Sequence, residues 1–497
     1  MTQDKGLAYV SDAISQAQLR LYKTYAKAPR RTALVIAFSL LKALVVLGWL
    51  VTRQKAGVFS FAPAQASQFE AQLKPNTSAA LPTLHAQSSS GLRDLFVQSK
   101  AAAHSLPEAV DLYVQRAKYI QNELLWRDTA GNVIQAHGGS ILYYNDIYYF
   151  YGENKGGRTL QPGTGKPPSI VHRVDVIGIS CYSSTDLINW KNEGLALPAG
   201  QHPDLDPSKV VERPRVLYND ATQRFVMWMH IDTADYELAS CGMATSASPT
   251  GPFTYMRSFR PHRHMCRDFT IFKDDDGTAL IAYSSERNKV MHVSRLTRDF
   301  TDVELGFART MVGLSREAPA MFKHGDIYLM VTSGCTGWLA NRAEVFYARD
   351  PLGNWESLGN PCVSRSVMLR ETTFHSQASH VLPIPGQPGR FIFMADRWFP
   401  QALGMSRYIW LPMWVVDIPQ GEEDFPSRKV VRPEDRARMR QRFRSMRPGP
   451  ASLKDLPPID VVVRWQQRWN LSALDAPPPL CKDMRPGTLV PDSECAL

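Results

Sequence analysis

Acidic and amide side chains recur at one kind of position in this sequence, directly before an apolar segment. They are Glu212, Asp268, Glu317 and Gln377. One acidic residue at such a place usually belongs to a solvated turn, but four polar residues before four similar segments indicate that they converge on one pocket. Carboxylates that share a pocket raise one another's pKa, so one of them can stay protonated near neutral pH. Such a group can act as a general acid beside a second group that handles water.

Five similar segments predict the elements that position these residues. Each has an alternating apolar run, a turn signal and a second, aromatic-rich run, which is the pattern of a β-hairpin. The hairpins begin at Ile141, Val216, Thr270, Ala320 and His380. Each period has room for four strands and helical periodicity is nearly absent, so the sequence predicts an all-β, five-bladed β-propeller. The innermost strands of its blades would line a central channel.

We expect this propeller domain to span residues 106–475. It would contain a basic insertion at residues 428–447 and a late strand in the stretch IDVVVRWQQRWNL, which follows that insertion. Residues 52–105 are rich in Ala, Gln, Ser and Pro and predict a stem with little structure. The Pro-rich residues 476–497 predict an extended tail.

Residues 32–51 predict a transmembrane helix. They form an apolar run of 20 residues with Lys42 as its one charge, and this length matches a hydrocarbon core of ~30 Å. The basic residues before the run favour a cytoplasmic segment 1–31 and a translocated remainder. The expectation is a single-pass type II membrane protein with its large domain lumenal or extracellular, in the Golgi if the chain is eukaryotic. A cleaved signal peptide is the alternative.

The net charge of +10 does not indicate a nucleic-acid partner. Residues 1–31 hold six Lys and Arg against two Asp, and residues 428–447 hold nine basic against two acidic residues. The remaining chain has 42 basic and 43 acidic residues. We therefore expect no nucleic-acid binding.

Cysteine usage does not describe a disulfide scaffold, because seven cysteines are an odd number in a long chain. Cys481 and Cys495 in the tail are candidates for a disulfide, and the others can be core thiols. The stretch HRHMC, residues 262–266, has no second ligand pair elsewhere, so a packing role is expected rather than zinc binding. Sequons at Asn76 and Asn470 fall on the predicted translocated side.

Seven ordered stretches resemble glycoside hydrolase family 43, and specifically its exo-β-1,3-galactanase branch. They are DTAGNVIQAHGG, YYFYGE, VERPRVLYN, RDFTIFKDDDGTA, EAPAMF, TSGCTGW and SQASHVLPIPG, running from about residue 126 to residue 410. The resemblance implies a five-bladed propeller that releases galactose from β-1,3-linked galactan by an inverting mechanism. It also implies a polysaccharide or glycoprotein glycan of the arabinogalactan type as substrate.

The resemblance implies roles for individual residues as well. Glu317 falls on the position of the general acid, and Asp268 on the carboxylate that tunes the pKa of this acid and orients it. The sugar hydroxyls would be held by Glu153, Glu212 and Tyr236. Thr336 and Trp338 would shape the wall of the sugar site.

This chain departs from most of the family at the start of the first blade. Most members have an Asp base there, where this chain has His137-Gly138-Gly139. The galactanase branch shares this absence and uses a glutamine, here Gln377, which would act as an imidic-acid tautomer or position the water. The identity of the base stays open. No cofactor is required; calcium occurs in related propellers, but no residue of this sequence specifies it.

Two other functions fit parts of the sequence. A propeller that binds glycans without cleaving them would explain the missing Asp base. A Golgi glycosyltransferase would use Asp274-Asp275-Asp276 as an Asp-x-Asp metal motif, but this stretch is followed by Gly between two strand-like runs and predicts a hairpin turn. No βαβ pattern for nucleotide binding surrounds it.

Overall fold

The structure is a computed structural model of the chain, and it describes residues 118–364, 366–417 and 459–475. All of these residues belong to one compact unit, Ser99–Leu497. The predicted anchor at 32–51 lies outside the described residues, as do the segments 1–31, 52–105, 428–447 and 476–497. Within the described ranges, no helix is long and apolar enough to cross a membrane.

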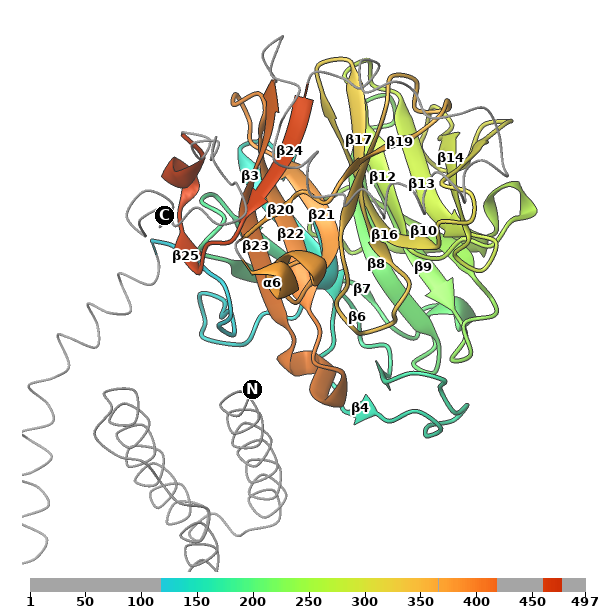
Figure 1. Ribbon diagram of the computed structural model, residues 1–497. Helices are drawn as coiled ribbons and strands as arrows, with labels where there is room; N and C mark the ends of the chain where they lie inside the picture. Colours follow the sequence, from blue (N-terminus) through green and yellow to red (C-terminus); the bar gives the residue numbers. More distant parts are fainter. Residues whose placement is uncertain (1–117, 365, 418–458, 476–497) are drawn as a thin grey trace, which may run out of the picture. The chain divides into compact units, whose positions relative to one another are not determined.

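The described residues form five blades of a β-propeller, each built on four antiparallel strands in sequence order (Figure 1). Blade 1 holds β2 (His137–Tyr144), β3 (Ile147–Glu153), β6 (Gly178–Ser184) and β7 (Lys191–Pro198). Blade 2 holds β8 (Val210–Asn219), β9 (Arg224–Asp232), β10 (Ser240–Ser246) and β11 (Thr254–Phe259). Blade 3 holds β12 (Phe269–Lys273), β13 (Ala279–Ser285), β14 (Val290–Arg295) and β15 (Ala308–Thr310). Blade 4 holds β16 (Arg316–His324), β17 (Ile327–Gly334), β18 (Glu344–Ala348) and β19 (Glu356–Gly359).

Blade 5 is built from β21 (Gln377–Pro383), β22 (Arg390–Arg397), β23 (Arg407–Asp417) and β24 (Ile459–Arg464). A fifth strand, β20 (Cys362–Val363), pairs in parallel with β24 at the edge of this sheet. The predicted late strand is therefore confirmed as the fourth strand of the last blade. The predicted all-β, five-bladed propeller is confirmed as well.

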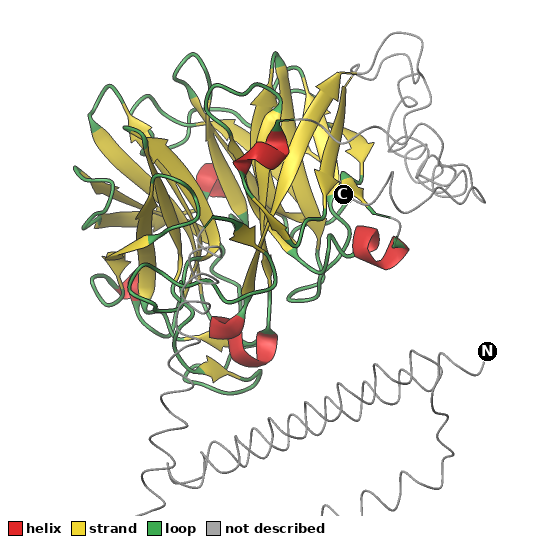
Figure 2. Ribbon diagram, turned by 90° about the vertical axis from the view of Figure 1, so that its left-hand side faces the viewer, coloured by secondary structure: helices red, strands yellow, loops and turns green. Residues whose placement is uncertain are grey.

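Regular structure outside the blades is short in the described part of the chain (Figure 2). Two small sheets pair β1 (Ile120–Gln121) with β25 (Arg468–Trp469) and β4 (Thr159–Leu160) with β5 (Arg173–Val174). The helical segments are α6 (Val367–Glu371) and the 3-10 helices η1 (Pro203–Leu205), η2 (Pro261–Arg263), η3 (Pro400–Met405) and η5 (Leu471–Leu474).

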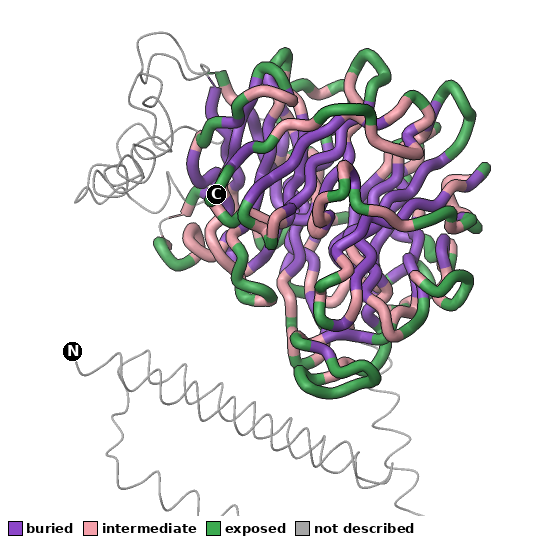
Figure 3. The backbone as a smooth tube through the Cα atoms, turned by 90° about the vertical axis from the view of Figure 1, so that its right-hand side faces the viewer, coloured by how far each residue is buried: buried purple, intermediate pink, exposed green. Residues whose placement is uncertain are grey.

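Five apolar clusters fill the spaces between neighbouring blades, so most strands are buried on both faces (Figure 3). Strand β9 shows how the sequence achieves this. Val226 and Trp228 belong to the cluster shared with blade 3, whereas Met227 and Met229 belong to the cluster shared with blade 1. Successive side chains of a strand point to opposite faces, which explains why the second run of the hairpin is apolar throughout.

Strand pairing and hydrogen bonds near the two ends of the described chain join blade 5 to blade 1. Strand β1 pairs with β25, and the buried side chain of Asn122 bonds to the backbone N–H and carbonyl of Trp410 at 2.8 and 2.9 Å. The Trp469 indole donates to the same Trp410 carbonyl. Because no strand is shared between blades 5 and 1, these bonds and the apolar cluster between the blades close the ring.

Four inner strands carry a register shift close to their first residues. The shifts lie between His137 and Ser140, Glu212 and Arg215, Glu317 and Ala320, and Ala378 and His380. The backbone is left-handed at Gly138, Arg213 and Ala318, with φ of 57°, 53° and 49°. A β-bulge bends a strand and redirects a side chain, and bulges are common next to active sites. Glu212, Glu317 and Gln377 thus sit at or next to such a bend, whereas Asp268 precedes β12, whose pairing has no register shift.

Two of the cysteines predicted as core thiols are joined. Cys241 and Cys266 form a disulfide, which corrects that expectation and removes Cys266 as a metal ligand. Cys181 and Cys362 are buried free thiols, and Cys335 is an exposed one. Cys481 and Cys495 lie outside the described residues.

Candidate active site

The predicted site residues meet at one end of the propeller. The first residues of an inner strand and the last residues of its antiparallel partner lie at the same end of a blade, as the pairing of His137 with Glu153 shows. Hydrogen bonds then connect the blades: Arg213 of blade 2 reaches Glu153 and Gln377, and Glu317 of blade 4 reaches Gln377. These contacts bring predicted site residues from different blades together.

Glu317 lies on β16 and is largely enclosed. Its Oε1 accepts a hydrogen bond from Gln377 Nε2 at 3.1 Å, and its Oε2 accepts one from Asn288 Nδ2 at 3.2 Å. Burial and the neighbouring carboxylate of Asp268 raise the pKa of Glu317 to about 8, although Arg213 opposes the shift. A carboxyl group with this pKa holds its proton at neutral pH and can donate it.

Asp268 precedes β12 and lies beside the acid. Its Oδ2 accepts the backbone N–H of Ala318 at 3.0 Å, and Arg213 forms an ion pair with the same oxygen at 3.1 Å. Ala318 follows Glu317 directly, so this hydrogen bond ties the carboxylate to the segment that carries the acid. Asp268 is thus placed both to raise the pKa of Glu317 and to orient it.

Gln377 is the first residue of β21, and its amide is oriented by its partners. The oxygen accepts from Arg213 Nη2 at 2.8 Å and from the Trp398 indole at 3.0 Å. The nitrogen donates to Glu317 and to Ser333 Oγ, both at 3.1 Å. Guanidinium and indole groups can only donate, so this environment requires a carbonyl oxygen and leaves no acceptor for the O–H of an imidic acid.

The contact between Gln377 and Glu317 differs from the expected geometry. In inverting glycosidases the acid and the group that handles water stand about 6.5–9.5 Å apart, whereas here the two side chains touch at 3.1 Å. That separation is therefore not present in this structure. A sugar that enters between them must break this hydrogen bond.

Arg213 connects four blades, and sequence reasoning gave it no role. Its side chain is buried and bonds to Gln377, to the carbonyl of Ala378 and to Asp268, while its backbone N–H donates to Glu153. The sequence does contain a signal, because two arginines interrupt the apolar inner strand VERPRVLYN. Pattern alone does not reveal which groups a buried arginine neutralises.

Glu153 and Glu212 share one lysine. Lys155 Nζ lies 2.7 Å from Glu153 Oε2 and 3.6 Å from Glu212 Oε1. Tyr236, predicted to contact the sugar, donates to Glu212 Oε1 at 3.0 Å. These three predicted residues are brought together, whereas Lys155 was not predicted.

His230 and Asp232 extend this charge network beyond Glu212. His230 Nε2 lies 2.9 Å from Asp232 Oδ2, and its Nδ1 lies 3.6 Å from Glu212 Oε2. Although burial alone would lower the pKa of His230, hydrogen bonds with Asp232 and Glu212 raise it to about 9. Burial opposes ionisation of Glu212 too, yet His230 and Lys155 lower the pKa of this carboxyl to about 2. Glu212 is therefore ionised at neutral pH and can accept hydrogen bonds.

Trp338 and Trp398 form an aromatic wall over the pocket. Their ring centroids are 4.9 Å apart, and Lys155 Nζ lies 6.0 Å from the Trp338 ring. Trp338 Nε1 is buried and has no hydrogen-bond partner among the described residues, so it is available to a ligand. Thr336, predicted with Trp338, is exposed and bonds within its own loop to Leu339 and Asn341, which places it at the rim.

His137, at the place of the family's usual Asp base, is fully buried and bonded. Its Nδ1 lies 3.0 Å from Asp396 Oδ1, and its ring stacks on Tyr408 at 5.0 Å. The other carboxylate oxygen accepts the N–H of Gly138. A Cβ at Gly138 would lie 2.3 Å from Glu153 Oε1, so the glycine allows close approach of the two strands.

Two groups of side chains have the composition of a metal site in the described part of the chain: Glu212, His230 and Asp268, and His264, Glu286 and His292. The first lies in the pocket, where Lys155 and Arg213 already neutralise the carboxylates. Its histidine has a raised pKa and carries a proton at neutral pH. Calcium takes six to eight oxygen ligands, so the residues present do not fit the calcium ion known from related propellers.

The hairpin turn at residues 274–277 is separate from this pocket. Asp274 N–H donates to the Thr278 carbonyl, and the Asp274 carboxylate accepts from Lys323 and Tyr328. The turn joins the far ends of β12 and β13, opposite to the end that carries Asp268. The three aspartates therefore belong to a structural turn, which removes the basis of the glycosyltransferase alternative.

Comparisons with known proteins agree with this geometry. The model of the family "Glycosyl hydrolases family 43" matches residues 137–382. The solved structure of the GH43 β-1,3-galactosidase BT3683 with galactodeoxynojirimycin is 33% identical, with a TM-score of 0.55, over 71% of this chain and 100% of that chain. A search of curated proteins found no match.

Two further structures show the same relationship over part of their length. The GH43 β-1,3-galactosidase BT0265 is 32% identical, with a TM-score of 0.56, over 72% of this chain and 64% of that chain. An exo-β-1,3-galactanase from Phanerochaete chrysosporium with galactose is 35% identical, with a TM-score of 0.52, over 59% of this chain and 64% of that chain. This chain thus spans 64% of the length of each. Given the match over the whole of BT3683, the family predicted from the ordered motifs is confirmed, and the chain belongs to glycosyl hydrolase family 43.

Proposed function

We propose that this protein is an exo-acting glycoside hydrolase that releases galactose from β-1,3-linked galactan, as in arabinogalactan-type glycans, with inversion at the anomeric carbon. The observation that carries the proposal is the environment of Glu317. Its raised pKa keeps a proton ready inside a pocket lined by carboxylates and aromatic rings. The galactosidase and galactanase titles of the related structures support galactan as the substrate class.

Glu317 acts as the general acid in this proposal. Asp268 maintains the raised pKa of Glu317 before the reaction and holds the acid through the Ala318 N–H. When the acid turns towards the glycosidic oxygen, its hydrogen bond from Gln377 is released. Protonation of the leaving oxygen then allows the bond to the sugar to break while water attacks the opposite face. The oxonium formed by this attack loses its extra proton to solvent, and solvent returns a proton to Glu317.

Gln377 positions water and does not remove its proton. The two donors at its oxygen favour the ordinary amide over the imidic-acid form. Its nitrogen, freed from Glu317, can donate a hydrogen bond to the oxygen of the attacking water. This role requires only that the amide be held in place, which Arg213 and Trp398 do.

The side chains of Glu153 and Glu212 would bind the hydroxyls of the terminal galactose, with Tyr236 beside them. Lys155 holds both carboxylates and lies near the Trp338 ring, so polar and apolar contacts to one sugar come from neighbouring side chains. Aromatic rings offer their faces to the C–H groups of a sugar and their edges to its hydroxyls.

Incubation of the full chain with β-1,3-galactan and β-xylan, followed by NMR of the released sugar, tests the proposal. We expect free galactose as the α-anomer from galactan and no sugar from xylan. Glu317→Gln should lose about 10²–10⁴-fold in rate, and the loss should be much smaller with an activated phenol as leaving group. Tight binding of galactan without any release would instead identify a glycan-binding propeller.

We propose further that the enzyme is anchored as a type II membrane protein through residues 32–51. The apolar run and its basic flank support this topology, and the Cys241–Cys266 disulfide agrees with a domain outside the cytosol. Glycosylation or protease mapping should place Asn76 and Asn470 on the side opposite the cytoplasm. If either site is found in the cytoplasm, this topology is contradicted, but the enzymatic proposal is not affected.

A further inference from the structure

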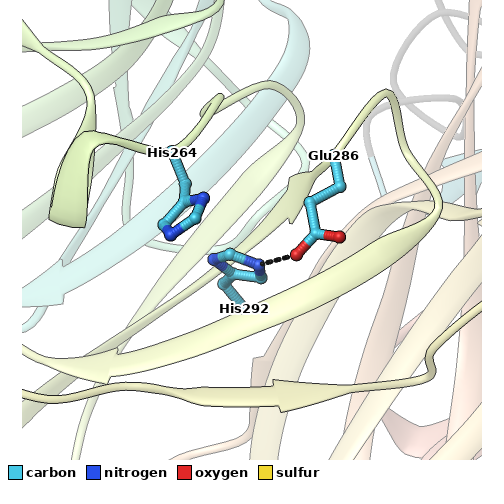
Figure 4. Close-up of side chains that lie close together, drawn as sticks. All are labelled: His264, Glu286 and His292. Atoms are coloured by element: carbon cyan, nitrogen blue, oxygen red, sulfur yellow. Dashed lines mark hydrogen bonds and ion pairs between the residues drawn. The ribbon is translucent and has the colours of Figure 1, made fainter.

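Three metal-ligating side chains from separate parts of blade 3 meet outside the pocket: His264, Glu286 and His292 (Figure 4). His264 precedes β12, Glu286 follows β13, and His292 lies on β14. One ligand atom from each of them lies within 4.8 Å of the other two. The sequence stretch HRHMC showed only His264 of this set, because the other two ligands come from the next hairpin.

The set has the chemistry of a zinc site. Two imidazoles and one carboxylate are the protein ligands of one class of zinc centre, which leaves a fourth position to water. His292 Nε2 already lies 3.0 Å from Glu286 Oε1, so an ion would take the place of the shared proton. His264 has ring contacts with His292 and Phe307 at 4.9 and 5.2 Å, and no hydrogen bond to its ring occurs among the described residues.

The other ring nitrogen of His292 also has a hydrogen-bond partner. The Tyr283 hydroxyl lies 3.3 Å from His292 Nδ1 and donates to the Pro261 carbonyl. With metal on Nε2, the proton of His292 moves to Nδ1, where the Tyr283 oxygen can accept it. Metal-bound histidines commonly donate their other N–H to such a partner, which fixes the ring.

Arg309 limits the affinity of the site. Its Nε and Nη2 each donate to one Glu286 oxygen at 2.7 Å, and its charge repels a dication. The ligand atoms must also move together by about 1 Å for zinc bonds of about 2.0–2.2 Å. These features describe a reversible site that responds to free metal.

We propose that His264, Glu286 and His292 form a reversible binding site for Zn²⁺ and similar borderline cations such as Co²⁺. The site is distinct from the sugar pocket, but one loop connects them. Glu286, Arg287 and Asn288 are consecutive non-glycine residues with left-handed φ of 51°, 57° and 60°. Asn288 donates to Glu317, so an ion that pulls on Glu286 moves the loop that contacts the acid.

Titration of the full chain with Co²⁺, followed by the visible absorption of the ion, tests binding directly. We expect one saturable site with an intense tetrahedral spectrum, which Zn²⁺ displaces. His264→Ala, which removes a half-buried ring without hydrogen bonds, should weaken binding at least tenfold, as should Glu286→Gln. His172→Ala, which changes a histidine on the β4–β5 loop, is the matched control and should bind like the wild type.

Arg309→Gln provides the opposite test. Loss of the competing charge should tighten Co²⁺ binding by about tenfold, whereas a variant that merely damages the fold would weaken it. The proposal is overturned if Co²⁺ binding is unchanged in both His264→Ala and Glu286→Gln. It is also overturned if the wild type binds no Co²⁺. Strict competition between the ion and galactodeoxynojirimycin, so that the two never bind together, would place the ion in the sugar pocket and would likewise overturn the proposal.

The consequence for catalysis rests on the proposed function and has its own readout. Zn²⁺ at the site should slow galactose release in the wild type and have at least tenfold less effect in His264→Ala. A protein that binds Co²⁺ but releases no galactose refutes the proposed function and leaves the metal site intact.

Discussion

Replacement of Asp268 by Asn should lower the pKa of the catalytic acid. The Asp268 carboxylate accepts the N–H of the residue after Glu317, and after burial its charge is the largest contribution to the pKa of about 8. Two unit charges about 5 Å apart interact by about 3 kcal/mol at an effective dielectric constant of about 20, which corresponds to about 2 pKa units. Arg213 pairs with Asp268 and offsets part of this interaction, so we expect a decrease of about 1–2 units.

The pH dependence of kcat/KM measures this pKa in the free enzyme. In the wild type, activity should fall as the pH rises through about 8, because Glu317 then loses the proton that it must donate. Loss of the neighbouring negative charge stabilises the Glu317 carboxylate, so in Asp268→Asn the fall should begin about 1–2 units lower. The maximal rate will fall too, since Asp268 also holds the segment of the acid. The position of the alkaline limb is therefore the informative quantity.

Asp274→Asn is the matched control, because it removes a carboxylate from the hairpin turn at the other end of the propeller. It should leave the alkaline limb where it is in the wild type. An alkaline limb in Asp268→Asn that stays in place or moves to higher pH would refute the electrostatic role of Asp268. An alkaline limb that persists at the wild-type pH in Glu317→Gln would show that another group is the acid.

Three further predictions concern the water, the closure of the ring and the buried histidine. Gln377→Ala should slow hydrolysis of galactan and of an activated aryl galactoside alike, because water attack is needed with either leaving group; added azide should restore part of the rate. Asn122→Ala leaves the Trp410 N–H and carbonyl without their buried partner and should lower the free energy of unfolding by about 2–4 kcal/mol, measured in urea. The folded pKa of His230, about 9, lies above its unfolded value, so its stabilising effect is complete below about pH 6.5 and is lost as the pH rises through about 9. The free energy of unfolding should therefore fall by about 3 kcal/mol more across this range in the wild type than in His230→Gln.

The fold was predictable from local pattern because each blade repeats one hairpin. Successive residues of a strand such as β9 bury both faces, and this leaves a continuous apolar run between two turns. The same repeat places a polar residue at the start of four inner strands, so Glu212, Asp268, Glu317 and Gln377 could be expected in one pocket. The turn at Asp274 was likewise readable, since Gly277 permits its positive φ of 83°.

The site was predictable in its members but not in its contacts. Nothing local to Arg213 indicates that its guanidinium bonds to Gln377 and Asp268, because these residues lie on other blades. For the same reason the hydrogen bond between Glu317 and Gln377 was not predictable: it depends on how blades 4 and 5 meet. The disulfide between Cys241 and Cys266 was also missed, since it joins a strand of blade 2 to the segment before blade 3.

The sequence by itself determined the five hairpins, the order of the blades and the polar residues that begin them, because β-strand pairing within a hairpin is local. Only the tertiary structure decided which of those residues touch. Closure of the ring sets the distances between side chains of different blades, and it brings Gln377 against Glu317 and Arg213. It also buries the acid beside Asp268 and so raises its pKa. The chemistry of Glu317 therefore arises from burial and charge that its neighbours in the chain do not supply.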